Sequence, residues 1–175
     1  MDMKKPKLFT VMFLIVMLSG GCGYHIVGTE KSSSHGVYSV AVPIFDNRTS
    51  EPEAEFIFAE ALRREFLKRG GIRLTDVKDA DVVFRGSIIR LAATNVAHNR
   101  FNQAVESRFF VTVDVRCEDR RTGRILWQDN QLTFSRSYPY GTTAFDSYTR
   151  RRAALEYIAQ QIAERIYDRF MTTLQ

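Results

Sequence analysis

Residues 105–117, VESRFFVTVDVRC, decide the fold that this sequence predicts. Two sets of side chains alternate along the segment. The mostly apolar set is Val105, Ser107, Phe109, Val111, Val113, Val115 and Cys117, and the mostly polar set is Glu106, Arg108, Thr112, Asp114 and Arg116. Successive side chains of a β-strand point to opposite faces, so the alternation indicates a strand with one buried face and one wet face. Phe110 interrupts the polar set, and we interpret it as partly covered by a neighbouring strand or loop.

Further strands are predicted on both sides of this segment. Residues 119–123, DRRTG, favour a hairpin turn that ends in a glycine, and residues 124–134, RILWQDNQLTF, favour the returning strand. Upstream, residues 81–91, DVVFRGSIIRL, predict a full strand, and residues 72–75 predict a brief one. Residues 37–44, VYSVAVPI, are β-branched and predict the first strand of the domain.

One helix is bounded clearly by its end signals. Ser50 followed by Glu53 predicts a capping box, with Pro52 in the first turn, where its missing N–H costs nothing. Apolar residues then recur at helical spacing, at Ala54, Phe58, Ala61, Leu62 and Phe66. Gly70 and Gly71 predict the end of the helix.

A second helix is predicted near the end of the sequence. Residues 137–141 are rich in Tyr, Pro and Gly and lead to an N-cap at Thr143 or Asp146. An apolar stripe follows at Leu155, Ile158, Ile162, Ile166 and Phe170, which indicates a face packed in the core. The order of strand, helix, strands with a hairpin, and helix predicts a largely antiparallel sheet with both helices on one face.

The first 21 residues have the three parts of an export signal. A basic start with three lysines precedes an apolar run over residues 8–18 and small residues at 19–21. The run is shorter than the roughly 20 apolar residues that span a bilayer, so a cleaved signal is favoured over an uncleaved membrane helix.

Cys22 follows the signal directly and resembles the lipid-bearing cysteine of the bacterial lipobox, although Ser19 stands where that motif usually has an aliphatic residue. The alternative is a disulfide, whose only possible partner is Cys117. Because strand alternation points Cys117 inward, we expect a lipid on Cys22 instead, with no other cofactor. Several acyl chains on this residue would anchor the protein to a membrane, and Gly23 favours sorting to the outer membrane.

These boundaries predict a signal peptide at residues 1–21, a lipidated tether at 22–36 and a single α/β domain at 37–175. With 45% hydrophobic and 26% charged residues, the composition is that of an ordinary globular protein. The formal charge is +5, part of which lies in the leader, and the arginines are spread along the chain. We therefore expect no nucleic-acid partner.

The sequence contains no catalytic signature, so we expect a protein that is not an enzyme. His25, His35 and His98 fall in predicted loops without metal-ligand spacing. The acidic cluster Asp76, Asp79 and Asp81 lacks the closing Glu of a calcium loop, and we interpret it as a solvated turn. An envelope hydrolase would need a nucleophile, base or metal set that is not visible.

A loop predicted at residues 92–104 is long for a hairpin and contains Arg100. Arg90 and Arg108 flank it in the sequence. Guanidinium groups bind phosphate and carboxylate through paired hydrogen bonds, so the hairpin tip could bind an acidic amphiphile. The alternative is a solvated loop with incidental arginines.

Several segments together resemble one family. They are residues 21–24 (GCGY), 40–47 (VAVPIFDN), 53–74 (the helix and its exit), 79–88 (DADVVFRGSI) and 121–127 (RTGRILW). In order and spacing they are similar to the LptE family of lipopolysaccharide-assembly lipoproteins. The resemblance implies an α+β fold with a four-stranded, mostly antiparallel sheet and two helices packed on one face, in the order βαβββα.

The resemblance also implies a function at the outer membrane. Members of the family plug the outer-membrane β-barrel LptD, assist its assembly and bind lipopolysaccharide for insertion into the outer leaflet. Basic residues near the sheet tip contact lipopolysaccharide, and the positions here that correspond are Arg90, Arg100 and Arg108. The alternative is another envelope lipoprotein, either an activator of a peptidoglycan synthase or a component of a secretion channel.

Overall fold

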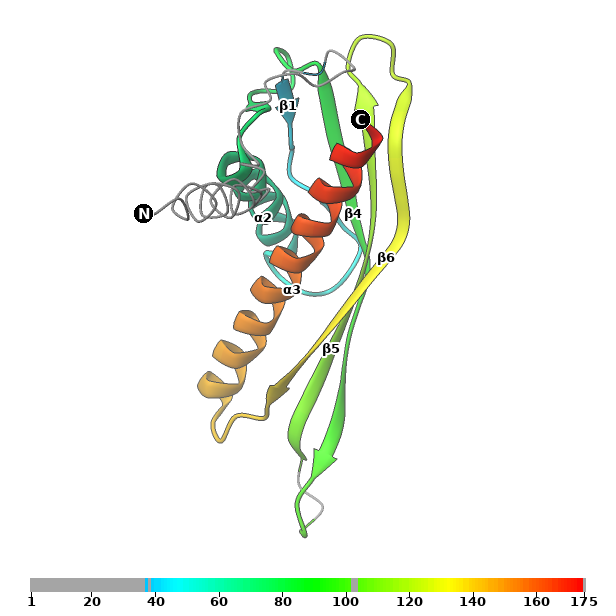
Figure 1. Cartoon of the computed structure of the whole chain (residues 1–175). Helices are drawn as coiled ribbons and strands as arrows, with labels where there is room; N and C mark the ends of the chain where they lie inside the picture. The colour runs from blue at the N-terminus through cyan, green and yellow to red at the C-terminus, as the bar shows by residue number, and fades with distance from the viewer. Residues whose placement is uncertain (1–36, 38, 102–103, 175) are drawn as a thin grey trace, which may run out of the picture. The chain divides into compact units, whose positions relative to one another are not determined.

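The computed structural model describes residue 37, residues 39–101 and residues 104–174. The predicted signal peptide, the tether and Cys22 lie outside the described residues. Within them, six strands form one sheet that packs against two helices (Figure 1). The elements are β1 (Ser39–Ala41), β2 (Asp46–Asn47), α2 (Ala54–Arg69), β3 (Arg73–Leu74), β4 (Val82–His98), β5 (Ala104–Asp119), β6 (Ile125–Pro139) and α3 (Ala144–Thr173).

The sheet is mixed, with both parallel and antiparallel pairs of strands. Its order is β3-β1-β4-β5-β6, and β2 pairs with β4 beyond the end of β1. β4, β5 and β6 are antiparallel neighbours, whereas β1 pairs parallel with both β3 and β4, and β2 pairs parallel with β4. The predicted α+β class is confirmed, but the prediction of four strands is wrong, and three short parallel pairings join the long antiparallel ones.

The chain path explains this difference. Parallel strands need a crossover connection, and α2 supplies one between β1 and β3. The predicted first strand also divides in two, because residues 42–45 leave the ladder before β2 rejoins it. Phe45 in this break is buried in the core, and the chain then pairs again at β2, farther along β4 than β1 does.

β4 and β6 are longer than the sequence predicts. Residues 92–98 continue β4 and pair with β5, from Ala92 opposite Phe110 to His98 opposite Ala104, with register shifts on both sides of Ala97. The predicted loop at 92–104 is therefore wrong, and only a short connection separates the strands. These residues carry small or polar side chains that resemble a loop, yet pairing with the well-patterned β5 holds them extended.

The buried face of β5 is confirmed from Ser107 to Cys117, and Phe110 on the other face is partly buried, as expected. Val105 differs, because it is exposed near the end of the hairpin. Burial at β5 comes from the helices that lie against this face (Figure 1). The buried thiol of Cys117 is free and points into the core.

The start of α2 does not use the predicted capping box. Glu53 is the N-cap residue itself and has a left-handed backbone, with φ of 62°. Its carbonyl oxygen accepts hydrogen bonds from the backbone N–H groups of Phe56 and Ile57, both at 3.1 Å. The Glu53 carboxylate instead forms an ion pair with Arg152 of α3. The predicted end of the helix is confirmed, because α2 stops at Arg69 before Gly70, whose φ is 67°.

Helix α3 begins as predicted. Thr143 is the N-cap, and its Oγ1 accepts a hydrogen bond of 3.1 Å from the backbone N–H of Asp146. All five residues of the predicted apolar stripe are buried. An aromatic cluster joins both helices to the sheet, because Phe84 of β4 lies with its ring centroid 5.4 Å from Phe66 and 4.9 Å from Phe170. Both helices therefore lie on the same face of the sheet (Figure 1).

Candidate binding surface

The face of the sheet that points away from the helices is polar. β5 sets its composition, because the alternation that buries Phe109 and Val113 turns Arg108, Thr112 and Arg116 outward. Threonine hydroxyl groups also meet across the strands on this face, because Thr112 Oγ1 on β5 lies 3.1 Å from Thr133 Oγ1 on β6. This outward surface of β4, β5 and β6, called here the outer face, carries the candidate binding residues.

The structure places two of the three predicted arginines on the outer face. Arg90 lies opposite Thr112, just after a bulge that follows Ile88, and Arg108 lies opposite Thr94. Thr112, which lies opposite Arg90, and Arg108 are four residues apart on β5, which corresponds to roughly 13 Å along the strand. Arg108 is held in place by a hydrogen bond of 3.0 Å from its Nε to Ser137 Oγ on β6.

Arg100 lies beyond the end of β4, in the connection to β5. Its guanidinium carbon lies 4.8 Å from the ring centroid of Phe101, a cation–π contact. Phe101 is 69% exposed, so this end of the hairpin presents a cation and an apolar ring side by side. The three predicted arginines thus extend along one hairpin without forming a single cluster.

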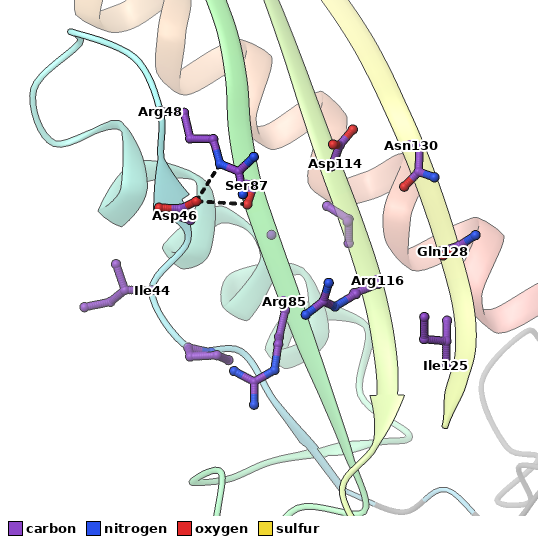
Figure 2. A pocket seen from close by; sticks show the side chains of 13 residues that line it. Ile44, Asp46, Arg48, Arg85, Ser87, Asp114, Arg116, Ile125, Gln128 and Asn130 are labelled. Carbon is purple, nitrogen blue, oxygen red and sulfur yellow. Dashed lines mark hydrogen bonds and ion pairs between the residues drawn. The ribbon is translucent and has the colours of Figure 1, made fainter. Parts of the chain in front are cut away.

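A cavity on the outer face was not predicted from the sequence (Figure 2). It has a volume of about 450 Å³ and lies between the segment around β2 and the first half of β6. Its charged lining residues are Asp46, Arg48, Arg85, Asp114 and Arg116. The alternation of β5 indicates that Asp114 and Arg116 face water, but only the strand register brings the other three residues beside them.

An ion pair and a hydrogen bond hold Asp46 at one side of this cavity. Arg48 Nε donates a hydrogen bond of 2.8 Å to Asp46 Oδ2, and Ser87 Oγ donates one of 3.3 Å to the same oxygen (Figure 2). The hydrogen bond from Arg48 lowers the pKa of the Asp46 carboxyl, and that carboxylate raises the pKa of Arg48. Both side chains are therefore charged at neutral pH.

The acidic residues predicted to form a solvated turn have a more specific arrangement. Asp81 Oδ2 accepts hydrogen bonds from the backbone N–H of Ser39 at 2.9 Å and from its hydroxyl at 2.8 Å. These bonds tie the entry of β4 to β1. Asp76 and Asp79 are exposed, as expected for a turn.

The described residues contain no group of three or more His, Cys, Asp or Glu side chains placed to hold a metal ion. His98 is exposed at the end of β4, whereas His25 and His35 lie outside the described residues. No helix among the described residues has the length and apolar character required to cross a bilayer.

The sequence matches one family model. That model is described as LptE, lipopolysaccharide-assembly, and it matches residues 38–170, well over half of the chain. A comparison with curated protein sequences gave no match.

Several solved structures share the fold at low sequence identity. A Caulobacter crescentus protein assigned as a lipoprotein is 16% identical with a TM-score of 0.54, and the alignment covers 74% of this chain and 89% of that one. A hypothetical protein from Chlamydia trachomatis is 13% identical with a TM-score of 0.55, covering 79% and 98%. An uncharacterized lipoprotein B from Nitrosomonas europaea is 10% identical with a TM-score of 0.50, covering 74% and 79%. These likenesses support the fold alone.

Proposed function

The chain belongs to the LptE lipopolysaccharide-assembly family, and from this premise we propose that it is the lipoprotein subunit that plugs the outer-membrane β-barrel LptD and binds lipopolysaccharide for insertion into the outer leaflet. The family match over residues 38–170 carries the proposal. It includes the helices, the sheet and the hairpin tip. Because the family consists of non-enzymatic lipoproteins, the protein acts by binding rather than by catalysis.

The outer face suits a position inside a large β-barrel. The lumen of such barrels is polar and contains water, and a domain that sits there needs a polar surface. Arginine, threonine and serine side chains cover the outer face, while the apolar side chains of β5 lie under the helices. The domain can therefore contact a polar wall without exposing its core.

The end of the β4–β5 hairpin suits the chemistry of an acidic amphiphile. A lipopolysaccharide carries phosphate groups next to acyl chains, so its recognition needs cations next to apolar side chains. Arg100 stacked on the exposed ring of Phe101 supplies both. Exposed Val96 and Val105 lie near the same end of the hairpin and add apolar surface.

Attachment at the membrane would come from acyl chains on Cys22. Several acyl chains on one residue hold a domain at a bilayer far more firmly than one chain does. We propose that the mature protein is anchored in this way in the outer membrane, facing the periplasm or lying in the barrel lumen. Residues 37–175 then form the part that reaches the barrel.

Lipopolysaccharide binding is tested on the full-length chain in detergent. A triple variant replaces Arg90, Arg100 and Arg108 by Glu, and a matched variant replaces the exposed Arg64, Arg121 and Arg124 by Glu. Both change the net charge equally. We expect at least tenfold weaker binding for the first variant and an unchanged affinity for the second. Equal affinities for the two variants would show that the hairpin arginines are not the binding site.

A further inference from the structure

Arg85 and Arg116 lie directly opposite each other on β4 and β5, on the outer face. Like charges at directly opposed positions of a sheet repel each other and destabilise it. Glu118 offsets part of this cost, because its two carboxylate oxygens contact Arg85 Nε at 2.9 Å and Arg116 Nε at 2.5 Å. One carboxylate thus serves two guanidinium groups, and the group of three keeps a net positive charge.

Among the described residues, Arg85 and Arg116 contact Glu118 through Nε, so their terminal nitrogens can bind another ligand. Each arginine meets the carboxylate through Nε, and the side chains are 50% and 53% exposed. A guanidinium group presents its remaining N–H donors in a planar fork that matches the oxygens of a phosphate. Gln128 of β6 lies opposite Arg116 and continues this row of donors across the sheet.

The opposite side of the same cavity presents hydrogen-bond acceptors. Asp114 Oδ1 accepts a hydrogen bond of 2.7 Å from the backbone N–H of Gln131, where β6 bulges and φ is 61°. A carboxylate can accept several hydrogen bonds, so Asp114 retains capacity for hydroxyl donors. Figure 2 shows Asp114 and Asn130 toward one end of the cavity and Arg85 toward the other.

We propose that this cavity binds a sugar phosphate, with the phosphate on Arg85 and Arg116 and the sugar hydroxyls on Asp46 and Asp114. A purely cationic site would select any anion. Here Arg85 and Arg116 lie at one end, and the carboxylates of Asp46 and Asp114 lie at the other, where Arg48 neutralises Asp46 (Figure 2). Such a site favours a ligand that combines an anion with hydroxyl donors. The volume of about 450 Å³ lies within the range of roughly 300–1,000 Å³ for small-ligand sites. This proposal does not rest on the function proposed above or on the hairpin arginines.

The binding test uses the full-length protein in detergent and three soluble probes. They are N-acetylglucosamine 1-phosphate, inorganic phosphate and N-acetylglucosamine, titrated by calorimetry at low salt. We expect the sugar phosphate to bind at least tenfold more tightly than either of the other two. Equal binding of inorganic phosphate would overturn the sugar part of the proposal, and no binding of the sugar phosphate would overturn all of it.

Arginine variants test whether the sugar phosphate binds in this cavity. The double variant Arg85→Gln and Arg116→Gln is expected to lose at least tenfold in affinity for the sugar phosphate, whereas Arg124→Gln, at an exposed arginine outside the cavity, is expected to bind normally. If the double variant does not fold, nuclear magnetic resonance of the wild-type protein tests the site instead, through the Nε–H signals of Arg85 and Arg116. They should shift on titration while the Arg124 signal stays in place, and unshifted signals would contradict the proposal.

Discussion

The ring of Phe45 occupies the space that a side chain on Gly86 would need. A Cβ atom built on Gly86 would lie 2.2 Å from Phe45 Cε2, well inside van der Waals contact. Phe45 is buried in the break between β1 and β2, and Gly86 lies on β4 next to the pairing with β2. The absence of a side chain at residue 86 therefore allows the first part of the chain to pack on the sheet.

Gly86→Ala should destabilise the domain by about 1–3 kcal/mol, because the added methyl group forces the Phe45 ring out of its packed position. Urea unfolding followed by circular dichroism measures the effect. Ser87→Ala, at the next residue, serves as the control and should change stability little. The double variant Gly86→Ala with Phe45→Leu should recover part of the loss, and no recovery would show that the cost arises elsewhere.

The aromatic cluster under α3 should contribute strongly to stability. Phe170 is fully buried against Phe84, whereas Phe145 near the start of the same helix is 80% exposed. Phe170→Ala should cost about 3–5 kcal/mol through lost burial and a cavity, and Phe145→Ala should cost almost nothing. Thermal or urea unfolding compares the two variants. Similar losses in both would contradict the described position of α3.

The N-cap of α3 makes a smaller contribution to stability than the aromatic cluster, and it can be measured separately. Thr143→Ala removes the acceptor for the backbone N–H of Asp146 and should cost about 0.5–2 kcal/mol. Thr143→Ser keeps a hydroxyl acceptor and should retain most of the stability. The comparison of these two variants in urea separates capping from helix propensity, and equal losses would mean that the hydrogen bond does not form.

The buried thiol of Cys117 should make stability depend on alkaline pH. Burial raises the pKa of this thiol from 9.0 to about 12, and the nearby Glu118 carboxylate adds to the shift. Between these values the unfolded chain releases the thiol proton and the folded chain keeps it, so the free energy of unfolding falls as pH rises from about 9 to 12. Urea unfolding at several pH values should show a steeper fall for the wild type than for Cys117→Ala. Parallel curves would show that the thiol titrates normally in the folded state.

The sequence predicted those features that depend only on residues near one another in the chain. The alternation of residues 107–117, the stop at Gly70, the cap at Thr143 and the stripe of α3 all depend on neighbours in sequence, and the structure confirms them. The parallel pairings of β1, β2 and β3 depend on where distant segments meet. Strands of two or three residues carry too little pattern to reveal such pairings.

The candidate sites also depend on contacts between distant segments, which local sequence patterns do not predict. The predicted Arg90, Arg100 and Arg108 lie along one hairpin, but their role as lipopolysaccharide contacts stays a prediction. The cavity residues Arg85 and Arg116 are 31 positions apart in the numbering and come together only through the register of β4 and β5. Their charges look incidental in the sequence, because nothing local marks two arginines as direct neighbours across a sheet.

The most direct test of the proposed function is affinity purification of the full-length chain from envelope membranes under gentle detergent extraction, followed by quantitative mass spectrometry. We expect the β-barrel LptD to co-purify with the chain at a ratio near one to one. Recovery of the chain alone, or with a peptidoglycan synthase or a secretion channel in place of LptD, would contradict the proposed function.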